Sequence, residues 1–228
     1  MKVGTKGWYD LSWNYGPGMA VPEWPGQKNQ EFSMDSFQME NTGGNQDFIH
    51  MNLHCGTHVD APGHYHPGGL SIDKVPFERW MGTCFTVDLE RPPLSTIDVK
   101  DLEPYEKQMG ETDMFFVRTG NDRLWGKHAY RTDYPFFTPE AGEYMVEKGV
   151  KIIGMDTPGP DASLTCGFRK GSPLHFTLLG NDVLIIENLA NLKAIAGRTT
   201  YVYALPIKIE GAFGGPARIV ARELDVQG

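Results

Sequence analysis

The stretch HCGTHVDAPGHYHPGG, residues 54–69, holds four of the chain's seven histidines and one aspartate, and it contains no lysine, arginine or glutamate. Gly56, the β-branched Thr57 and Pro62 all oppose a helix in this stretch. Histidines that only face solvent need neither a neighbouring carboxylate nor such breaks in regular structure. The stretch therefore indicates a site that binds a metal ion and moves a proton.

Three side chains in this stretch predict the metal site itself. On a strand, His54, His58 and Asp60 point to the same side, together with Gly56. A fully extended strand would separate His54 from His58 by about 13 Å, too far for both to bind one ion at bonds of about 2 Å. A bend at Gly56 removes this obstacle at little cost. We therefore expect a kinked strand that directs all three side chains toward one point; surface histidines beside a turn are the alternative.

A second group of candidate ligands lies far along the chain, in SPLHFTLLG (172–180) and VLIIENL (183–189). Glu187 follows four apolar residues, so we expect its side chain to be buried. A buried carboxylate is costly unless it is paired or binds a cation, and no lysine or arginine is close in the sequence. His175 and Glu187 are therefore predicted to complete the metal site, with one ion or two; a glutamate that reaches water at a strand end is the alternative.

The proton carrier is predicted to be His64, which follows the Pro62-Gly63 turn. An imidazole has an ordinary pKa near 6.5, which suits acid–base work at neutral pH. A bound cation would lower the pKa of a water molecule to about 7 and so supply the nucleophile. Cys55 points away from His54 on the predicted strand, so it is not the expected nucleophile. Three other histidines are expected to be structural or surface residues: His50, His66 and His128.

Composition places the chain among ordinary globular proteins. Its 228 residues are 40% hydrophobic and 22% charged, which suits one domain, residues 1–228, with a core of good size. The net charge of −8 and the lack of a basic run argue against a nucleic-acid partner. No apolar run approaches the roughly 20 residues that cross a bilayer, and the first residues lack a signal-peptide pattern. Three scattered cysteines suit reduced thiols, so we expect a cytoplasmic protein.

Strand patterns outnumber helix patterns along the chain. The segment TPEAGEYMVEKG predicts a helix over 138–149, with Thr138 as its N-cap and Gly149 as its end. Strands are predicted over the following segments: 48–55, 83–90, 114–120, 150–158, 183–189 and 201–209. We expect an α/β protein of mixed α+β type, with a curved mixed sheet or barrel and a few flanking helices.

Several segments together resemble one known family. HCGTHVDAPGH resembles the His-x-Gly-Thr-His-x-Asp-x-Pro-x-His signature of the metal-dependent cyclase family, which includes bacterial kynurenine formamidases and isatin hydrolases. Four further segments are similar to family segments in the same order: DLSWNYGPGMAVPEWPG, FTPEAGEYMVEKGVKIIGMDTPGPD, HFTLLGNDVLIIENLANL and LPIKIEGAFGGPARIVA. Where formamidases commonly continue the Asp-Thr-Pro segment with Ser-Val-Asp, this chain has Gly159-Pro160-Asp161.

The resemblance implies a swivelling β/β/α fold, a homodimer or homotetramer, and one or two Zn²⁺ or Mn²⁺ ions per subunit. It also implies that Asp60 and Glu187 bridge two ions. The roles that it assigns are metal ligation for His54, His58, Asp60, His175 and Glu187, general acid/base catalysis for His64, and a place in the wall of the substrate pocket for Trp24.

The leading functional prediction is a metal-dependent hydrolase of carbon–nitrogen amide bonds, an arylformamidase of the kynurenine formamidase type. Aromatic residues around Trp13, Trp24 and Phe168 favour an aryl-bearing substrate. A hydrolase that opens a cyclic amide, imide or lactone is the alternative within the family, and a non-catalytic metal- or ligand-binding protein is the alternative outside it. Arg169 and Lys170, in the loop 164–172, either meet an anionic group of the substrate or only face solvent.

Overall fold

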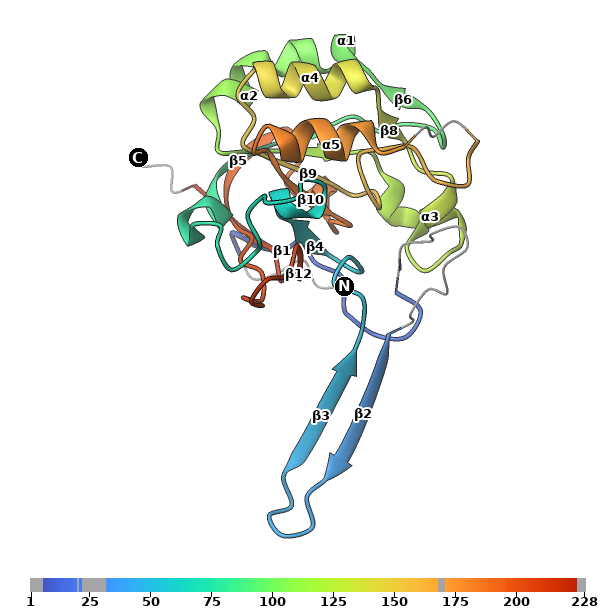
Figure 1. Ribbon diagram of the computed structural model, residues 1–228. Helices are drawn as coiled ribbons and strands as arrows, with labels where there is room; N and C mark the ends of the chain where they lie inside the picture. The colour runs from blue at the N-terminus through green and yellow to red at the C-terminus, as the bar shows by residue number, and fades with distance from the viewer. Residues whose placement is uncertain (1–5, 20, 22–31, 168–170, 225–228) are drawn as a thin grey trace.

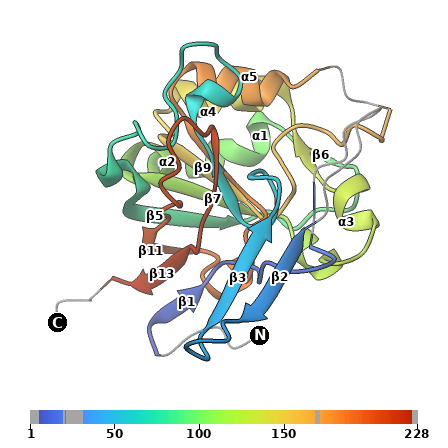
Figure 2. The same ribbon diagram turned by 60° about the horizontal axis from the view of Figure 1, so that its bottom comes forward.

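The structure is a computed structural model that describes residues 6–19, 21, 32–167 and 171–224. Nine strands of these residues form one curled sheet (Figures 1 and 2). In spatial order they are β1 (Trp8–Asp10), β13 (Val220–Glu223), β11 (Arg198–Tyr203), β5 (Met81–Asp88), β7 (Met114–Arg118), β9 (Ile152–Met155), β10 (Leu184–Glu187), β4 (His58–Asp60) and β12 (Gly214–Pro216).

The centre of the sheet is parallel and its two sides are antiparallel. β5, β7, β9 and β10 run parallel to one another, whereas β4 pairs antiparallel with both β10 and β12. Every residue of β7, β9 and β10 is buried, as expected for parallel strands that are covered on both faces. These strands coincide with apolar runs of the sequence, so the strands predicted within 114–120, 150–158 and 183–189 are confirmed.

Helices cover one face of the sheet. Figure 1 shows α1 (Val99–Leu102), α2 (Glu106–Glu111), α4 (Pro139–Glu147) and α5 (Pro173–Gly180) together on that side. The predicted helix is confirmed as α4: the Thr138 side chain accepts a hydrogen bond from the Ala141 backbone N–H, and Gly149 leaves the helix with a φ of +80°. The shorter elements are α3 (Ala129–Thr132), β6 (Thr96–Ile97), β8 (Phe136–Phe137), η1 (Pro62–His64), η2 (Phe77–Trp80), η3 (Glu103–Tyr105), η4 (Asn121–Leu124) and η5 (Leu192–Ala194).

The curled sheet separates two hydrophobic cores. Between the sheet and the helices, Phe115 and Ile153 of the strands pack with Met145 of α4 and Leu178 of α5. The opposite face curls around a second core, which includes Phe116 of β7. Successive residues of β7 thus enter different cores, which is why its first four residues, 114–117, are all apolar. No helix within the described ranges is long and apolar enough to cross a membrane.

A separate two-stranded hairpin projects from the sheet (Figures 1 and 2). Its strands are β2 (Ser33–Gln38) and β3 (Asn45–His50), and all their residues are exposed. The predicted strand over 48–55 is therefore wrong in its second half, because β3 ends at His50 and residues 53–57 form turns and bends. The alternation in FIHMNLHC continues past the strand end, so the pattern alone could not locate it.

Candidate metal centre

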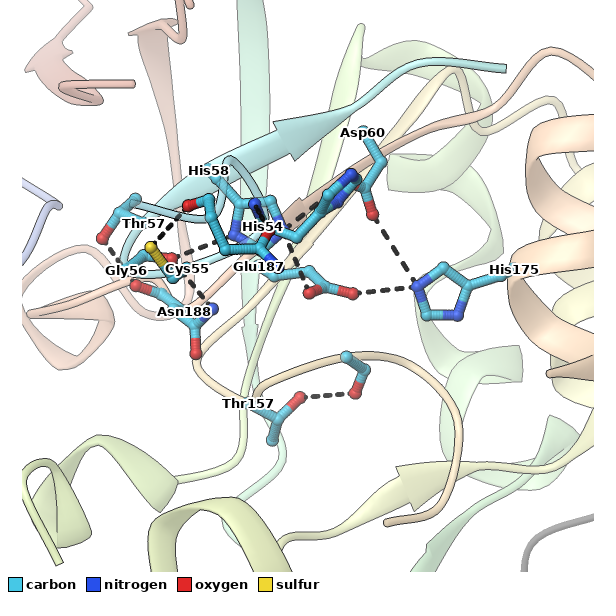
Figure 3. A network of polar contacts seen from close by, with 12 residues as sticks. His54, Cys55, Gly56, Thr57, His58, Asp60, Thr157, His175, Glu187 and Asn188 are labelled. Carbon is cyan, nitrogen blue, oxygen red and sulfur yellow. Dashed lines mark hydrogen bonds and ion pairs between the residues drawn. The ribbon is translucent and has the colours of Figure 1, made fainter. Parts of the chain in front are cut away.

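The register of β4 on β10 places three of the predicted ligands on one face of the sheet. Glu187 lies directly opposite His58, and Ile185 lies opposite Asp60. Residues that face one another across an antiparallel pair share a face, as do residues two apart on one strand. The Nε2 atom of His58 lies 3.3 Å from Glu187 Oε2 and 3.4 Å from Asp60 Oδ1 (Figure 3).

His54 reaches these groups from the turn that precedes β4. Gly56 has a φ of +61°, a conformation that glycine adopts without a steric penalty. The turn brings His54 Nδ1 to 2.7 Å from Asp60 Oδ1. Space for the imidazole comes from Gly214 of β12, where a Cβ atom would lie 2.6 Å from the His54 ring. The expected bend at Gly56 is therefore present, but His54 lies on a turn and not on a strand.

Helix α5 supplies His175 from the opposite side of the centre. Its Nε2 atom lies 3.1 Å from Glu187 Oε1 and 3.7 Å from Asp60 Oδ2 (Figure 3). The other ring nitrogen, Nδ1, lies 2.5 Å from Asp161 Oδ2. His175 and Glu187 are both buried. The strand-end glutamate thus faces the imidazoles of His58 and His175, not water.

His64, at the end of η1, lies beside the centre. Its ring stacks on that of His54 with centroids 4.0 Å apart, and its centroid is 5.9 Å from that of His175. The aromatic ring of Tyr65 stacks on His175 at 4.8 Å. The five predicted ligands and the predicted acid/base residue therefore lie in one cluster: His54, His58, Asp60, His64, His175 and Glu187.

The donor atoms fit a metal ion. Two triads, each with donor atoms within 4.8 Å of one another, can hold a cation: His58 with Asp60 and Glu187, and His54 with Asp60 and His64. His58 Nε2 and Asp60 Oδ2 are buried without a hydrogen-bond partner among the described residues. In that part of the chain, Asp60 and Glu187 form ion pairs with histidines alone. Zinc and manganese bind imidazole nitrogens and carboxylate oxygens. An ion at this site would therefore give the two unpaired buried atoms a partner.

The carboxylates of the cluster stabilise positive charge on the imidazoles of His58 and His175, whose pKa values they raise. Burial opposes ionisation of Asp60, but His54 and His58 hold its pKa well below the usual range. Burial lowers the pKa of His58, yet the Asp60 and Glu187 carboxylates outweigh burial and raise this pKa to about 9. His64 behaves differently, because burial lowers its pKa to about 4 against the opposing effect of Asp60. His64 is therefore neutral at neutral pH.

Two polar residues that support the cluster were missed by the sequence-based predictions. Asn188 directly follows Glu187, and its Nδ2 donates to the Gly56 carbonyl at 2.9 Å (Figure 3). The same carbonyl accepts a hydrogen bond from His58 Nδ1 at 3.0 Å, which leaves His58 Nε2 toward the carboxylates. Asp161, the second residue, contacts His175 as described above. Their closeness in sequence to Glu187 and to the Asp-Thr-Pro segment was the available signal.

The other residues singled out from the sequence have different positions. Trp24, Phe168, Arg169 and Lys170 lie outside the described residues. The indole of Trp13 stacks on that of Trp125, with ring centroids 4.6 Å apart. His50 lies on the exposed hairpin, and His128 is exposed just before α3. His66 Nε2 lies 2.9 Å from the Phe176 carbonyl oxygen. The Cys55 thiol is buried, and burial raises its pKa to about 12.

A family model, described as Putative cyclase, matches residues 9–162, which is well over half of the chain. The chain belongs to the cyclase family. A kynurenine formamidase from Erythrobacter litoralis is 31% identical over 216 residues, covering 95% of this chain and 94% of that protein. Cyclase-like protein 1 of Arabidopsis thaliana is 28% identical over 222 residues, covering 93% of this chain and 83% of that protein. The predicted family is therefore confirmed.

Solved structures of the cyclase family share the fold. Isatin hydrolase A from Labrenzia aggregata superposes with a TM-score of 0.84 at 24% identity, covering 95% of this chain and 93% of that chain. A structure described as a potential metal-dependent hydrolase with cyclase activity has a TM-score of 0.76 at 26% identity, covering 96% and 98% of the two chains. The predicted mixed α+β fold, with a curled sheet and flanking helices, is confirmed by these similarities.

Proposed function

We propose that this chain is a metal-dependent hydrolase of carbon–nitrogen amide bonds, and more specifically an arylformamidase of the kynurenine formamidase type. The observation that carries the proposal is a pair of histidine–carboxylate triads that share Asp60, one of which includes His64, whose ring stacks on that of His54. The similarity to a kynurenine formamidase over nearly the whole chain supports the amide class.

The proposed ligands are His54, His58, Asp60, His175 and Glu187, and the proposed ions are Zn²⁺ or Mn²⁺. Both metals accept imidazole and carboxylate donors. Asp60 presents one oxygen to His54 and His58 and the other to His175, so its carboxylate could serve two ions rather than one. When bound, such a cation polarises an amide carbonyl and lowers the pKa of a water molecule.

His64 is the proposed general acid/base. Its pKa is lowered to about 4 by burial, so its ring is neutral at pH 7 and has a free nitrogen that can accept a proton from the attacking water. The same nitrogen can return that proton to the departing amine nitrogen, which completes the cycle. The His64 ring stacks on His54, and its nitrogen lies close to the Asp60 carboxylate.

The substrate is proposed to carry an aryl group. Trp24 is the proposed pocket residue, on the strength of its place in the family's N-terminal segment. Tyr65, which stacks on His175, presents a further aromatic ring beside the catalytic centre. The test is a panel of small amides, imides and lactones that includes arylformamides. Turnover of the arylformamides would support an arylformamidase, whereas turnover of the cyclic compounds alone would indicate a ring-opening hydrolase.

The decisive experiment compares His64→Ala with His66→Ala. His66 is a matched control, since it lies two residues away and bonds to the Phe176 carbonyl, not to the ligand cluster. We expect His64→Ala to keep its full metal content and to lose roughly 10²- to 10⁴-fold in kcat on arylformamides. His66→Ala should retain both metal and turnover.

Elemental analysis of the two variants separates the possible roles of His64. Full activity in His64→Ala would refute the acid/base role. Loss of a metal ion from that variant would instead make His64 a ligand, because its nitrogen lies within the same triad as His54 and Asp60.

We also propose that residues 1–228 form one domain and that the protein assembles as a homodimer or homotetramer. The projecting hairpin supports the assembly, because an isolated two-stranded hairpin is only marginally stable in water. Both of its faces carry exposed apolar side chains: the rings of Phe37 and Phe48 stack on one face, and Met34 pairs with Ile49 on the other. A second subunit that covers both faces would account for this arrangement.

A further inference from the structure

Asp161 makes three contacts at the start of α5. Its Oδ1 accepts a hydrogen bond from the Leu174 backbone N–H at 2.9 Å, and its Oδ2 accepts one from the His175 backbone N–H at 3.2 Å. The same Oδ2 lies 2.5 Å from His175 Nδ1. Both residues of the pair are buried, with Asp161 2% and His175 7% exposed.

This arrangement determines which nitrogen of His175 carries a proton. An ionised carboxylate can only accept hydrogen bonds, so Nδ1 must be the donor in this contact. The other nitrogen, Nε2, then faces Glu187 Oε1 and Asp60 Oδ2. In the neutral ring, Nε2 is thus the atom with a lone pair directed into the donor set.

We propose that Asp161 is a positioning residue of the metal centre, which fixes the Nδ1–H tautomer and the ring orientation of His175 so that Nε2 is offered to a cation. The inference rests on the proposed metal site and adds a residue to it. A carboxylate behind a ligating histidine also increases the basicity of the ligand. His58 has the neutral carbonyl of Gly56 in the equivalent place, so the two imidazoles are not supported equally.

A matched control exists within the same connection after β9. Asp156 is also buried, and it accepts hydrogen bonds from the Thr119 and Gly120 backbone N–H groups and from the Thr119 hydroxyl. No contact of Asp156 involves an imidazole among the described residues. Asp156→Asn therefore removes a buried carboxylate that holds backbone groups, and Asp161→Asn removes one that also holds His175.

The test measures the affinity for zinc alone, by competition with a chromophoric chelator and without substrate. We expect Asp161→Asn to bind zinc roughly 10- to 100-fold more weakly than the unmodified protein. Asp156→Asn should bind zinc within about threefold of the unmodified protein, even though its unfolding temperature falls. Equal loss of affinity in both variants, or none in Asp161→Asn, would overturn the proposal.

If Asp161→Asn does not fold, the tautomer of His175 can be measured in the unmodified protein. In the zinc-loaded, ¹⁵N-labelled unmodified protein, the His175 ring should carry its proton on Nδ1, protected from exchange with solvent. Absence of that proton would refute the assigned tautomer. Neither readout depends on turnover, so failure of this inference is distinguishable from failure of the proposed amide hydrolysis.

Discussion

The carboxylate of Asp60 links the two halves of the candidate metal centre. One of its oxygens lies 2.7 Å from His54 Nδ1 and 3.4 Å from His58 Nε2, while the other lies 3.7 Å from His175 Nε2. A carboxylate has two oxygens and about four lone-pair positions, so it can serve partners on both sides. Asp60 therefore orients imidazoles that come from a turn, a strand and a helix.

Removal of metal should make the protein's stability depend on pH through His58. The pKa of this imidazole is raised from 6.5 to about 9 by the net effect of Asp60 and Glu187 against burial. The stabilisation is fully present below about pH 6.5, where the imidazole is protonated in both the folded and unfolded states, and it is lost as the pH rises through 9. The metal-free protein should therefore show a falling unfolding temperature between pH 7 and pH 10.

Thermal unfolding with and without zinc checks this prediction. Zinc must displace the His58 proton, so its affinity for the protein should rise over the same pH range in which the metal-free protein loses stability. His58→Gln should reduce the pH dependence of both the zinc affinity and the unfolding temperature of the metal-free protein. A metal-free protein whose stability is constant or rises from pH 7 to pH 10 would contradict the charge state assigned to the centre.

At the scale of elements, the space around His54 depends on a glycine of the neighbouring strand. Gly214→Ala would place a Cβ atom 2.6 Å from the His54 ring, so the imidazole must move. We expect kcat/KM on arylformamides to fall roughly a hundredfold, because small displacements of catalytic groups have effects of this size. The folded structure, followed by circular dichroism, should persist.

Gly110→Ala is the matched control for this substitution. Gly110 lies in α2, and a Cβ atom there meets only the Lys148 carbonyl at an ordinary 3.6 Å. The substitution should stabilise the protein by about 0.5–1 kcal/mol and leave activity unchanged. Normal activity in Gly214→Ala, or an equal loss of activity in Gly110→Ala, would show that the close approach of Gly214 to the His54 ring does not matter for activity.

Local signals in the sequence predicted some elements and not others. α4 was predictable because Thr138, Pro139 and Gly149 mark its ends within a few residues. α5 was not predicted, because SPLHFTLLG is apolar on nearly all sides and has no distinct polar stripe. Such a helix is recognisable only once its packing against α4 and β10 is known.

The candidate centre divides in the same way. His54, His58 and Asp60 are close in sequence, so their pattern alone predicted a shared site. Asp161 acquires its contact with His175 only when α5 packs against the connection after β9, and Asn188 reaches Gly56 only when β10 pairs with β4. Tertiary packing, not sequence spacing, assigns their positions.

At the scale of the whole molecule, the hairpin is expected to determine assembly. Phe37→Thr/Phe48→Thr removes the stacked rings and introduces threonine, a β-branched residue that favours strands. We expect this double variant to lose the homodimer or homotetramer and to sediment as a monomer. Phe176→Thr is a control of similar exposure on the body of the protein, and it should leave the assembly intact. An unmodified protein that is itself monomeric, or a double variant of unchanged mass, would refute the role of the hairpin.

The antiparallel pairing of β4 with β10 joins an early segment of the chain to a late one, and the proposed ligands lie across that seam. A chelated ion there acts as a removable cross-link, whose closure of a long loop restricts the unfolded chain much as a disulfide would. Because an ion that binds only the folded state stabilises it by mass action, a cell starved of metal would hold more of this protein unfolded and open to proteolysis. Supply of the ion would then govern the lifetime of the polypeptide as well as its chemistry.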